Sequence, residues 1–477
     1  MILYRFTRDL RLEDHAGLAA AARHGEILPV LVIDSALRER VSTSPRRAAF
    51  FCGAVAALNA ALLERGSHLI VRRGPLIATL AALARAVSAT GVAWSVCYSD
   101  PASDQRLQSA VEERGLRALC VHDAPAIPPE ETTMARSSGG EGYRSLVPYV
   151  QTWRSLEIST FEAPLLQRFA KPALESEPLP FPEEFGASMA ADASATPAEA
   201  VRRLGEFLEV DAAQYALAVN VPADDRTSHL AAHLSFGTIA ARTIARETRR
   251  RTEDPFLLAE ERASLRAFAR SLAQRDFFLQ LAWYNPRMSR DPLQEKMRDF
   301  PFARTSPHLD AWLSGRTGYP LVDAGVRQLH GTGWMHPRVR AIAASFLCFD
   351  LGVDWRVGHA EWDRWLVEDD PAISIGNWQW IAGVGADLAA YPRIYNPQKQ
   401  ARRFDPTLAY ARRWIPELAH VPDAFVRRGE RESQIELPLF AGQAYPVAVV
   451  DHDAAARAFL ERYQAFMTAG VARPANR

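Results

Sequence analysis

The sequence contains no uninterrupted run of 18 apolar residues, and charged Arg5, Arg8 and Asp9 follow closely behind its short apolar start. We therefore expect neither a membrane-spanning helix nor a signal peptide, but a cytoplasmic protein with no membrane partner. The four cysteines are widely spaced and include no CxxC pair. This spacing argues against a disulfide framework, a zinc site and an iron–sulfur cluster, so no metal site is expected.

Net charge is also lacking, because 56 basic residues balance 56 acidic ones. Any nucleic-acid contact must therefore come from a local basic face. Hydrophobic residues make up 48% and charged residues 23%, which excludes a disordered or collagen-like chain. A length of 477 residues favours two domains.

Residues 1–125 alternate β-rich runs with helical stretches, of which Arg46–Arg65 is the longest. The candidate strands are Ile2–Phe6, Ile27–Ile33, His68–Arg72, Ala93–Tyr98 and Ala118–Val121. Strands that alternate with helices predict a parallel sheet with right-handed crossovers. No GxGxxG follows the first strand, so the usual dinucleotide fingerprint is missing, and the sequence does not identify a ligand for the strand ends.

Residues 126–205 are rich in proline and include Ser137–Gly140, which is typical of a long linker. One helical piece is expected near Tyr143–Ser155. From residue 206 to 477 the pattern is helical, with apolar positions three and four apart in 257–284 and 338–351, and no strand is expected. The sequence thus predicts an α/β domain at 1–125, a linker at 126–205 and an all-α domain at 206–477.

Chemistry could lie in several segments of the helical domain. Nine of the eleven tryptophans lie between Trp283 and Trp414, which fits core packing or a role beside an aromatic cofactor. Asp224–Thr238 enters a helix at Thr227 and Ser228, as an ordinary N-cap or as a phosphate grip. Gly331–Arg340 and Glu368–Asn396 gather aromatic, basic and acidic residues. None of these segments is decisive alone.

Six motifs in order are much more specific: FTRDLRLEDH (6–15), TGYPLVDAGVRQL (317–329), GTGWMH (331–336), DWR (354–356), NWQWIAG (377–383) and RIYNP (393–397). Together they resemble the photolyase/cryptochrome family over almost the entire chain. The resemblance implies an N-terminal α/β domain, a long linker and a helical domain that binds folded FAD. It also implies a second, antenna chromophore, whose identity the sequence does not give.

The resemblance assigns FAD-binding roles position by position. Tyr215 and the run Thr227, Ser228, His229 and Leu230 match the phosphate grip, in which Ala231 replaces the usual serine. Arg275 matches a cofactor-side arginine. Trp334 and Arg340 match residues that line the isoalloxazine, and Glu368 and Asp370 match the facing acids, the first of which is normally aspartate. A positive Arg340 would favour the anionic and reduced forms of the flavin.

The family usually reduces its light-excited flavin through three tryptophans. Trp378 and Trp355 match the proximal and middle members of that path. Phe302 occupies the distal position and is much harder to oxidise than tryptophan, so a residual route through another aromatic residue stays open.

The substrate pocket departs from the pattern of dimer-repairing members. Ser271, Gln274, Pro337 and Ala341 occupy the positions of the family's glutamate, tryptophan, asparagine and methionine, and Ser374 replaces the asparagine that faces the flavin. Trp380 is retained. Arg338 and Arg393 match DNA-phosphate-facing positions, whereas Val219 replaces another expected arginine. We expect poor repair of ordinary dimers, because serine cannot supply a carboxylic acid.

Three functions follow from the resemblance. The first is a light-driven photolyase that flips a pyrimidine dimer toward reduced FAD. The second is a cryptochrome-like flavoprotein that senses light or redox state, and the third uses the flavin on another small substrate. The replaced pocket favours the second or third. We expect a monomer with weak, salt-sensitive DNA binding, in which Arg275, Arg338 and Arg393 form the phosphate-binding face, and no protein partner is identified. The chain ends soon after its last expected helix, which is modest evidence against a signalling tail.

Overall fold

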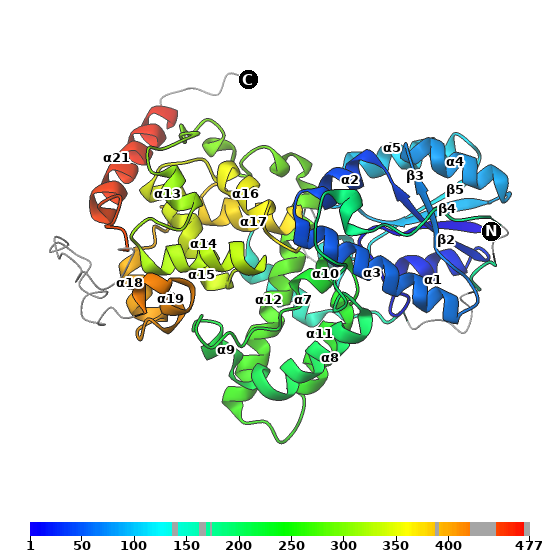
Figure 1. The fold of residues 1–477 in the computed structure, drawn as a ribbon, viewed down its shortest axis with the longest axis horizontal. Helices are drawn as coiled ribbons and strands as arrows, with labels where there is room; N and C mark the ends of the chain where they lie inside the picture. Colours follow the sequence, from blue (N-terminus) through cyan, green and yellow to red (C-terminus); the bar gives the residue numbers. More distant parts are fainter. Residues whose placement is uncertain (136–141, 162–167, 172–173, 387–390, 420–444, 472–477) are drawn as a thin grey trace. The chain divides into compact units, whose positions relative to one another are not determined.

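The fold was examined in a computed structural model, which describes residues 1–135, 142–161, 168–171, 174–386, 391–419 and 445–471 (Figure 1). The Ser-Gly run predicted as linker at 137–140 lies outside the described residues. Packing groups the chain into two compact units. The first contains 1–215, 228–289 and 366–373, and the second contains 216–227, 290–365 and 374–477.

The first unit is built on a five-stranded parallel sheet with the order β3-β2-β1-β4-β5. Its strands are β1 (Ile2–Arg5), β2 (Ile27–Ile33), β3 (Ile70–Arg73), β4 (Gly91–Ser95) and β5 (Arg117–Val121). All five predicted strands are confirmed, with ends shifted by no more than three residues. In the register, Ile2 of β1 lies beside Ile27 of β2 and Gly91 of β4.

Helices cover both faces of this sheet (Figure 1). They are α1 (Ala16–Ala22), α2 (Ser35–Ser42), α3 (Pro45–Glu64), α4 (Leu76–Ala86) and α5 (Pro101–Glu112). Alternate residues of β2 face opposite cores: Leu31 packs with α1 and α3, whereas Val30 and Val32 pack with α4 and α5. This two-residue period is what a buried strand requires.

Helix α3 is long and apolar enough to cross a membrane by composition alone. However, 61% of its apolar window is buried, and Phe51, Val55 and Leu58 belong to the core on one face of the sheet. We therefore interpret α3 as a core helix.

The segment predicted as a linker is held against the sheet. Its described helices are α6 (Pro129–Met134), α7 (Leu146–Ser155), η1 (Pro182–Phe185) and α8 (Pro197–Glu206). The backbone of Ile27 bonds to Arg168 and Ala170, at 2.9 and 2.8 Å, and Glu177 donates to the carbonyl of Val71 at 3.2 Å. The linker segment therefore runs alongside β2 and β3.

The helical part of the first unit carries the site segments described below. Its elements are the short turns η2 (Phe207–Asp211), η3 (Ala212–Gln214) and η4 (Pro286–Ser289), and the helices α10 (Ala231–Phe236), α11 (Ala241–Thr252) and α12 (Ala259–Tyr284). Helix α12 confirms the prediction for 257–284. Helix α9 (Tyr215–Ala218) lies at the boundary between the units.

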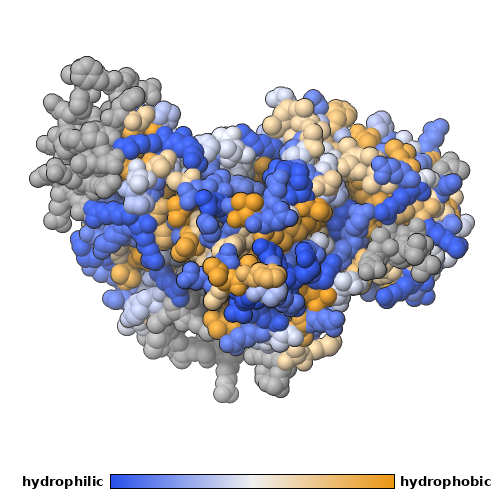
Figure 2. All heavy atoms as spheres, turned by 90° about the horizontal axis from the view of Figure 1, so that it is seen from below, coloured by the Kyte–Doolittle hydropathy of each residue, from blue (hydrophilic) through white to orange (hydrophobic). Residues whose placement is uncertain are grey.

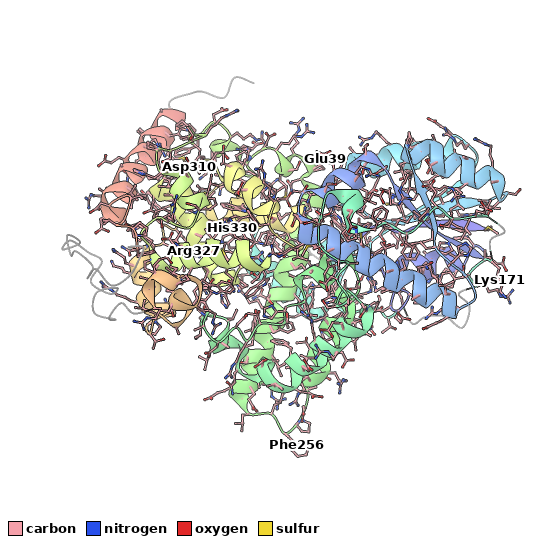
Figure 3. The ribbon with its side chains drawn as sticks, viewed as in Figure 1. Glu39, Lys171, Phe256, Asp310, Arg327 and His330 are labelled. Carbon is pink, nitrogen blue, oxygen red and sulfur yellow. The ribbon has the colours of Figure 1, made fainter. Side chains whose placement is uncertain are left out.

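The second unit is helical throughout its described residues, apart from one isolated bridge between Ala303 and Val353. Its helices are α13 (Leu309–Leu313), α14 (Pro320–Thr332), α15 (Pro337–Ser345), α16 (Trp355–Asp363), α18 (Pro397–Phe404), α19 (Ala409–Trp414) and α21 (His452–Val471), with turns η5 (Glu295–Met297) and η7 (Pro416–Leu418) and the π-helix η6 (Phe346–Asp350). Helix α17 (Pro371–Ile381) begins in the first unit and continues into the second. Arg327 of α14 (Figure 3) bonds to Glu417 of η7 at 2.7 and 2.9 Å, which joins these two elements.

Some large apolar side chains reach the surface. Phe256 is 92% exposed in the loop between α11 and α12 (Figure 3), and Leu258 is 67% exposed. Figure 2 shows one face of the molecule, on which hydrophobic residues are scattered among hydrophilic ones. Single exposed hydrophobic residues are normal on protein surfaces, so these residues do not define a binding face.

Candidate functional site

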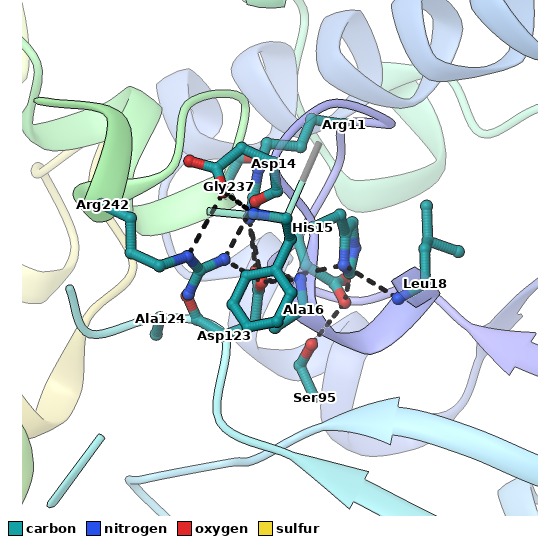
Figure 4. A network of polar contacts seen from close by, with 12 residues as sticks. Arg11, Asp14, His15, Ala16, Leu18, Ser95, Asp123, Ala124, Gly237 and Arg242 are labelled. Atoms are coloured by element: carbon teal, nitrogen blue, oxygen red, sulfur yellow. Dashed lines mark hydrogen bonds and ion pairs between the residues drawn. The ribbon is translucent and has the colours of Figure 1, made fainter. Parts of the chain in front are cut away.

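The opening motif, Phe6–His15, forms a buried polar network after β1 (Figure 4). The carboxylate of Asp9 accepts hydrogen bonds from the hydroxyls of Tyr4 and Ser95, both at 2.6 Å, and lies 3.4 Å from His15 Nε2. Burial alone would raise the pKa of Asp9, but its bond to His15 lowers the pKa. The network therefore fixes the loop that leads out of β1.

Asp123, directly behind β5, is the centre of a second buried cluster (Figure 4). Arg11 donates to both of its carboxylate oxygens at 2.9 and 2.8 Å, and Arg242 of α11 donates at 2.7 Å. Burial opposes the charge of Asp123, yet these arginines hold its pKa below the ordinary value. The cluster joins the carboxyl edge of the sheet to α11.

Gly237 lets α10 approach this motif closely. It ends α10 with a φ of 68°, and an added Cβ would lie 2.2 Å from the carbonyl oxygen of Arg8. Leu10 donates its backbone N–H to Phe236 at 3.0 Å, and Arg11 donates to the carbonyl of Gly237 at 3.1 Å. A side chain at position 237 would therefore separate α10 from the opening loop.

Asp369 stands between the two acids that the sequence assigns to the flavin, and it is 2% exposed. Arg40 donates its Nε to this carboxylate at 3.0 Å, Arg8 lies at 3.1 Å and Arg47 at 3.9 Å. Burial raises the pKa of Asp369, but the three arginines lower it below the ordinary value. The carboxylate is therefore charged and compensated inside the protein.

Backbone contacts hold the same segment. The fully buried Arg47 donates to the carbonyls of Glu368 and Leu366, at 3.0 and 3.4 Å. The N–H of Asp369 donates to Ser235 Oγ of α10 at 2.6 Å. Residues 366–369 are thus fixed between α3 and α10.

Asp370 points to a different partner from Asp369. Its carboxylate lies 3.5 Å from Arg275 of α12, and burial raises its pKa although Arg275 opposes the shift. Glu368 is partly buried and is anchored through its backbone. The arginine cluster around Asp369 therefore fixes the backbone from which Glu368 and Asp370 project.

We expect Asp369→Asn to lower the free energy of unfolding by about 3–5 kcal/mol, because three arginines would face no buried negative charge. Chemical denaturation measures the change. Glu13→Gln is the matched control, since its pair with Arg65 is well exposed and should contribute no more than about 1 kcal/mol. Equal losses of unfolding free energy in the two variants would show that the three arginines do not depend on the charge of Asp369.

Arg275 and Asp276 of α12 tie the start of the linker to the helical segment. Arg275 donates to the carbonyl of Ala124 at 2.7 Å. Asp276 accepts from the backbone of Ala126 at 2.9 Å and from the indole N–H of Trp153 at 2.9 Å. Burial raises the pKa of Asp276 to about 6, although Arg275 at 3.6 Å opposes this.

This raised pKa predicts a pH effect. Folded Asp276 keeps a proton that the unfolded chain releases near pH 4, so its stabilising contribution is present below about pH 4 and is lost as the pH rises through about 6. Asp276→Asn keeps an acceptor oxygen and removes the buried charge. Relative to wild type, its unfolding free energy should rise by about 2 kcal/mol between about pH 4 and 7.

Urea unfolding across this pH range measures the effect. Asp123→Asn is a control that should show little pH dependence across this range, because the lowered pKa of Asp123 places the loss of its stabilising contribution below about pH 4. A pH-independent difference between wild type and Asp276→Asn would show that Asp276 is charged throughout.

The residues assigned to the phosphate grip precede the short helix α10. Tyr215 packs edge-on against Phe207 and Phe268, at ring-centroid distances of 5.9 and 5.3 Å. Thr227 Oγ1 is buried and has no hydrogen-bond partner within the described residues. His229 has a φ of 48° and Leu230 is buried, while Ser228 is partly buried. A buried hydroxyl without a partner fits a polar ligand such as a phosphate.

In the second unit, the assigned flavin-lining residues lie around the start of α15. Arg340 is partly buried and donates to the carbonyl of Met335 at 2.7 Å. Trp334 is partly exposed and lies edge-on to His336 at 6.0 Å. Ser374 lies on α17 one turn before Trp378, so the two share a face of that helix.

The assigned electron path is only partly visible as ring contacts. Trp378 is 3% exposed, and within the described chain its ring partner is Trp362, at a centroid distance of 4.5 Å. Trp355 is 1% exposed and carries the guanidinium of Arg356 over its ring at 4.7 Å. Phe302 packs with Phe300 at 4.7 Å.

The replaced pocket residues belong to two helices. Ser271 and Gln274 lie three residues apart on α12, and the hydroxyl of Ser271 donates to the carbonyl of Phe268 at 2.7 Å. Pro337 begins α15 and is exposed, and Ala341 follows one turn later. Trp380 lies on α17 and is partly buried. The serine hydroxyl thus donates to its own helix and also interacts with the side chain of Tyr215, where burial raises the pKa of the tyrosine and Ser271 opposes the shift.

Two of the three arginines assigned to DNA are accessible. Arg393 is exposed, and Arg338 is partly buried, stacks over Phe404 at 4.7 Å and donates its Nε to Asn220 at 3.0 Å. Arg275 is different, because its side chain is only 10% exposed and pairs with Asp276 and Asp370. The expectation that Arg275 adds to an exposed phosphate-binding face was therefore wrong.

The first unit thus brings Arg275 to Asp370, while Tyr215 packs against Phe268. In the second unit, Trp378 contacts Trp362. Sequence reasoning missed Asp369, its arginines and Trp362. The third acid between Glu368 and Asp370 was the one sequence feature that could have pointed to the arginine cluster around Asp369. No sequence pattern identified Trp362, because its contact with Trp378 depends on how α16 packs against α17 in the folded chain. The described residues include no group of three or more His, Cys, Asp or Glu placed to hold a metal ion.

Comparisons with known proteins identify the family of the chain. A model described as the DNA photolyase domain matches residues 2–171, and one described as the FAD binding domain of DNA photolyase matches residues 268–465. The chain is 34% identical over 470 residues to a deoxyribodipyrimidine photo-lyase of Halobacterium salinarum, covering 95% of this chain and 96% of that protein. The chain belongs to the photolyase/cryptochrome family.

Solved structures of this family have the same fold. A class III photolyase from Agrobacterium tumefaciens has a TM-score of 0.82 and 27% identity, with 98% of each chain covered. A cryptochrome from Synechocystis has a TM-score of 0.84 and 25% identity, with 97% of this chain and 98% of the other covered. The chain therefore resembles members named as repair enzymes and members named as cryptochromes.

Proposed function

We propose that this protein is an FAD-binding, blue-light-responsive flavoprotein whose substrate pocket departs from standard dimer repair. The observation that carries the proposal is the environment of Ser271: a hydroxyl bonded to its own helix stands where repairing members present a glutamate. Gln274 beside it offers no stacking ring. The six motifs and most assigned FAD-binding residues are retained, although Ala231, Phe302 and Val219 also depart from the family pattern. This combination favours a cryptochrome-like protein or a photolyase of divergent specificity.

The residues present suit FAD. Thr227 offers a buried hydroxyl without a partner among the described residues, and Asp370 faces Arg275 in a buried pair. Tyr215, Thr227, Ser228, His229 and Leu230 would hold the phosphates, and Trp334, Arg340, Glu368, Asp370 and Ser374 would line the flavin. FAD excited by blue light supplies one-electron chemistry. Arg340 would favour negative charge on the ring, and Asp370 would keep Arg275 in place.

A spectrum of the purified protein tests the proposal. We expect flavin absorbance in the blue, directly or after reconstitution with FAD. Arg340→Gln should weaken FAD retention or shift the flavin spectrum. Arg298→Gln should do neither, because Arg298 forms an exposed ion pair with Glu295 in the second unit. Protein that takes up no FAD after reconstitution would contradict the proposal, and an unchanged Arg340→Gln spectrum would remove Arg340 from the site.

The alternative is a deoxyribodipyrimidine photolyase that repairs DNA with an electron from reduced FAD. The name of the Halobacterium relative favours it. We also infer weak DNA binding through Arg338 and Arg393, a monomeric state, a cytoplasmic location and a second chromophore in the N-terminal domain. Binding to a DNA duplex that weakens steeply with salt would support the phosphate contacts.

A further inference from the structure

A buried tyrosine at the carboxyl edge of the sheet is hydrogen-bonded to a histidine. Tyr98 follows β4 and His122 follows β5, and these two strands of the first unit pair in parallel, with Ser95 beside Val121. The hydroxyl of Tyr98 lies 2.5 Å from Nδ1 of His122, and Nε2 of His122 lies 3.0 Å from Oε1 of Glu130 in α6. Tyr98 is 5% exposed, whereas the side chains of His122 and Glu130 are 18% and 38% exposed. The hydrogen bonds therefore lead from the interior to the solvent.

The chemistry of the three groups fixes the direction of both hydrogen bonds. Burial raises the pKa of Glu130, but its bonds to His122 and Trp283 lower it below the ordinary value, so the ionised carboxylate only accepts. In the neutral imidazole, Nε2 of His122 is therefore the donor and carries the ring proton. Nδ1 then carries none and accepts from the hydroxyl of Tyr98. Tyr98 thus faces a base that lies within reach of direct proton transfer.

Simple ionisation and direct attack on a substrate both fail at Tyr98. Burial, Glu130 and Asp276 raise the pKa of Tyr98 well above its ordinary value, which excludes a phenolate near neutral pH. The buried position also keeps the hydroxyl away from any substrate that it would have to attack. Oxidation requires neither access nor a phenolate, because an electron can tunnel from the ring while the proton moves along the hydrogen bond to His122.

Trp283, in the last turn of α12, connects this pair of residues to the surface. Its ring lies edge-on to His122 at a centroid distance of 4.8 Å and to Tyr98 at 6.2 Å. Trp283 is partly exposed and also bonds to Glu130. A carboxylate beside an indole favours the positive charge that oxidation leaves on the ring. Trp283 is therefore the ring through which an electron can leave Tyr98.

We propose that Tyr98, His122 and Glu130 form a redox-active tyrosine site that intercepts one-electron oxidants of the peroxyl-radical class. One electron passes from Tyr98 through Trp283 to the peroxyl radical, the O–H bond of Tyr98 breaks, and the proton forms an N–H bond at Nδ1 of His122. The products are a neutral tyrosyl radical, an imidazolium paired with Glu130, and a peroxide anion that takes a proton from water. A thiolate then returns one electron and becomes a thiyl radical, while the proton moves back to Tyr98. This activity goes beyond the proposed function and needs no flavin.

Freeze-quench EPR of the purified full chain, exposed to peroxyl radicals from a water-soluble azo initiator, tests the site. We expect a tyrosyl signal that Tyr98→Phe reduces several-fold, since this substitution removes only the hydroxyl. Tyr149→Phe is the matched control, because Tyr149 is fully buried and its hydroxyl has no hydrogen-bond partner among the described residues. The control should leave the signal unchanged. Equal signals in wild type and Tyr98→Phe would overturn the proposal.

The role of His122 as proton acceptor has a readout that packing alone would not change. His122→Phe keeps a ring beside Trp283 and removes the base, so the tyrosyl yield should fall several-fold although Tyr98 is present. Radical formation should be slower in deuterium oxide in wild type but not in this variant. Thermal unfolding checks the fold, and His122→Gln replaces His122→Phe if that chain does not fold. A yield that neither substitution lowers would overturn the proposal. Because the assay involves no flavin, a chain that takes up no FAD would contradict the proposed function alone.

Discussion

Wild-type protein with fully reduced FAD should repair an ordinary cyclobutane pyrimidine dimer slowly under light. Ser271 is too short and too weak an acid to serve the lesion, and its hydroxyl is already bonded to the carbonyl of Phe268. General acid–base assistance contributes about 10²–10⁴-fold, and a lost stacking ring at Gln274 costs about 1–3 kcal/mol per base. Pro337 has no side-chain donor to replace asparagine.

Restoring the two α12 side chains should raise repair by at least about fivefold, which is the smaller of these effects (about 1 kcal/mol). Ser271 and Gln274 are three residues apart on one helix, Ser271 is exposed and Gln274 is partly buried, so Ser271→Glu/Gln274→Trp can be built with little disturbance of the core. Ser271→Gln/Gln274→Trp is the matched control, since it restores the ring without the acid. The measurement is the light-dependent loss of dimers from a defined oligonucleotide.

Two results would change the interpretation. Fast repair by the wild type would show that the substitutions do not disable the pocket, and the photolyase alternative would then stand. Equal rates for the Glu and Gln variants would remove the acid from the explanation and leave stacking. Groups that act on one bound lesion are not additive, so single variants are expected to recover less than the pair.

The α/β fold could be predicted because its signals are local. Strands buried on both faces appear as short continuous runs of apolar, β-rich residues, as Ile27–Ile33 of β2 does, and such runs are visible in the sequence. The long periodic helix at 259–284 was predictable for the same reason. Short helices such as α10 and α13 have too few turns to give a clear period.

The contacts that position the candidate site were not predictable, because they join residues far apart in the chain. Arg40 and Asp369 are separated by 329 residues, and no local pattern pairs them. The family resemblance identified Glu368 and Asp370 but not the acid between them. Similarly, the tryptophan cluster was evident in composition, whereas the choice of Trp362 over Trp355 as the ring partner of Trp378 depends on how α16 and α17 pack.

Trp378→Phe should nearly abolish photoreduction of bound FAD, because Trp378 matches the flavin-proximal tryptophan and is the first oxidisable ring of the assigned path. The substitution keeps an aromatic side chain beside Trp362 and Gly358, so the fold should be retained. Absorbance under blue light with a thiol reductant measures the rate, and thermal unfolding checks the fold. Trp365→Phe is the control, because Trp365 contacts His330 and donates to Glu361, away from the assigned path. Equal photoreduction rates in wild type and Trp378→Phe would show that Trp378 contributes to packing and not to electron transfer.

Phe302→Trp should act in the opposite direction and open the route through Trp355. Ala303, the next residue, pairs through its backbone with Gly352 and Asp354 at 3.0 and 2.8 Å, which keeps position 302 near Trp355 in the chain's packing. An indole there would give Trp355 a donor that phenylalanine cannot replace. This substitution should speed photoreduction when Trp378 is present, and in a Trp378→Phe background it should not. An equal gain in both backgrounds would mean that electrons reach the flavin without passing Trp378.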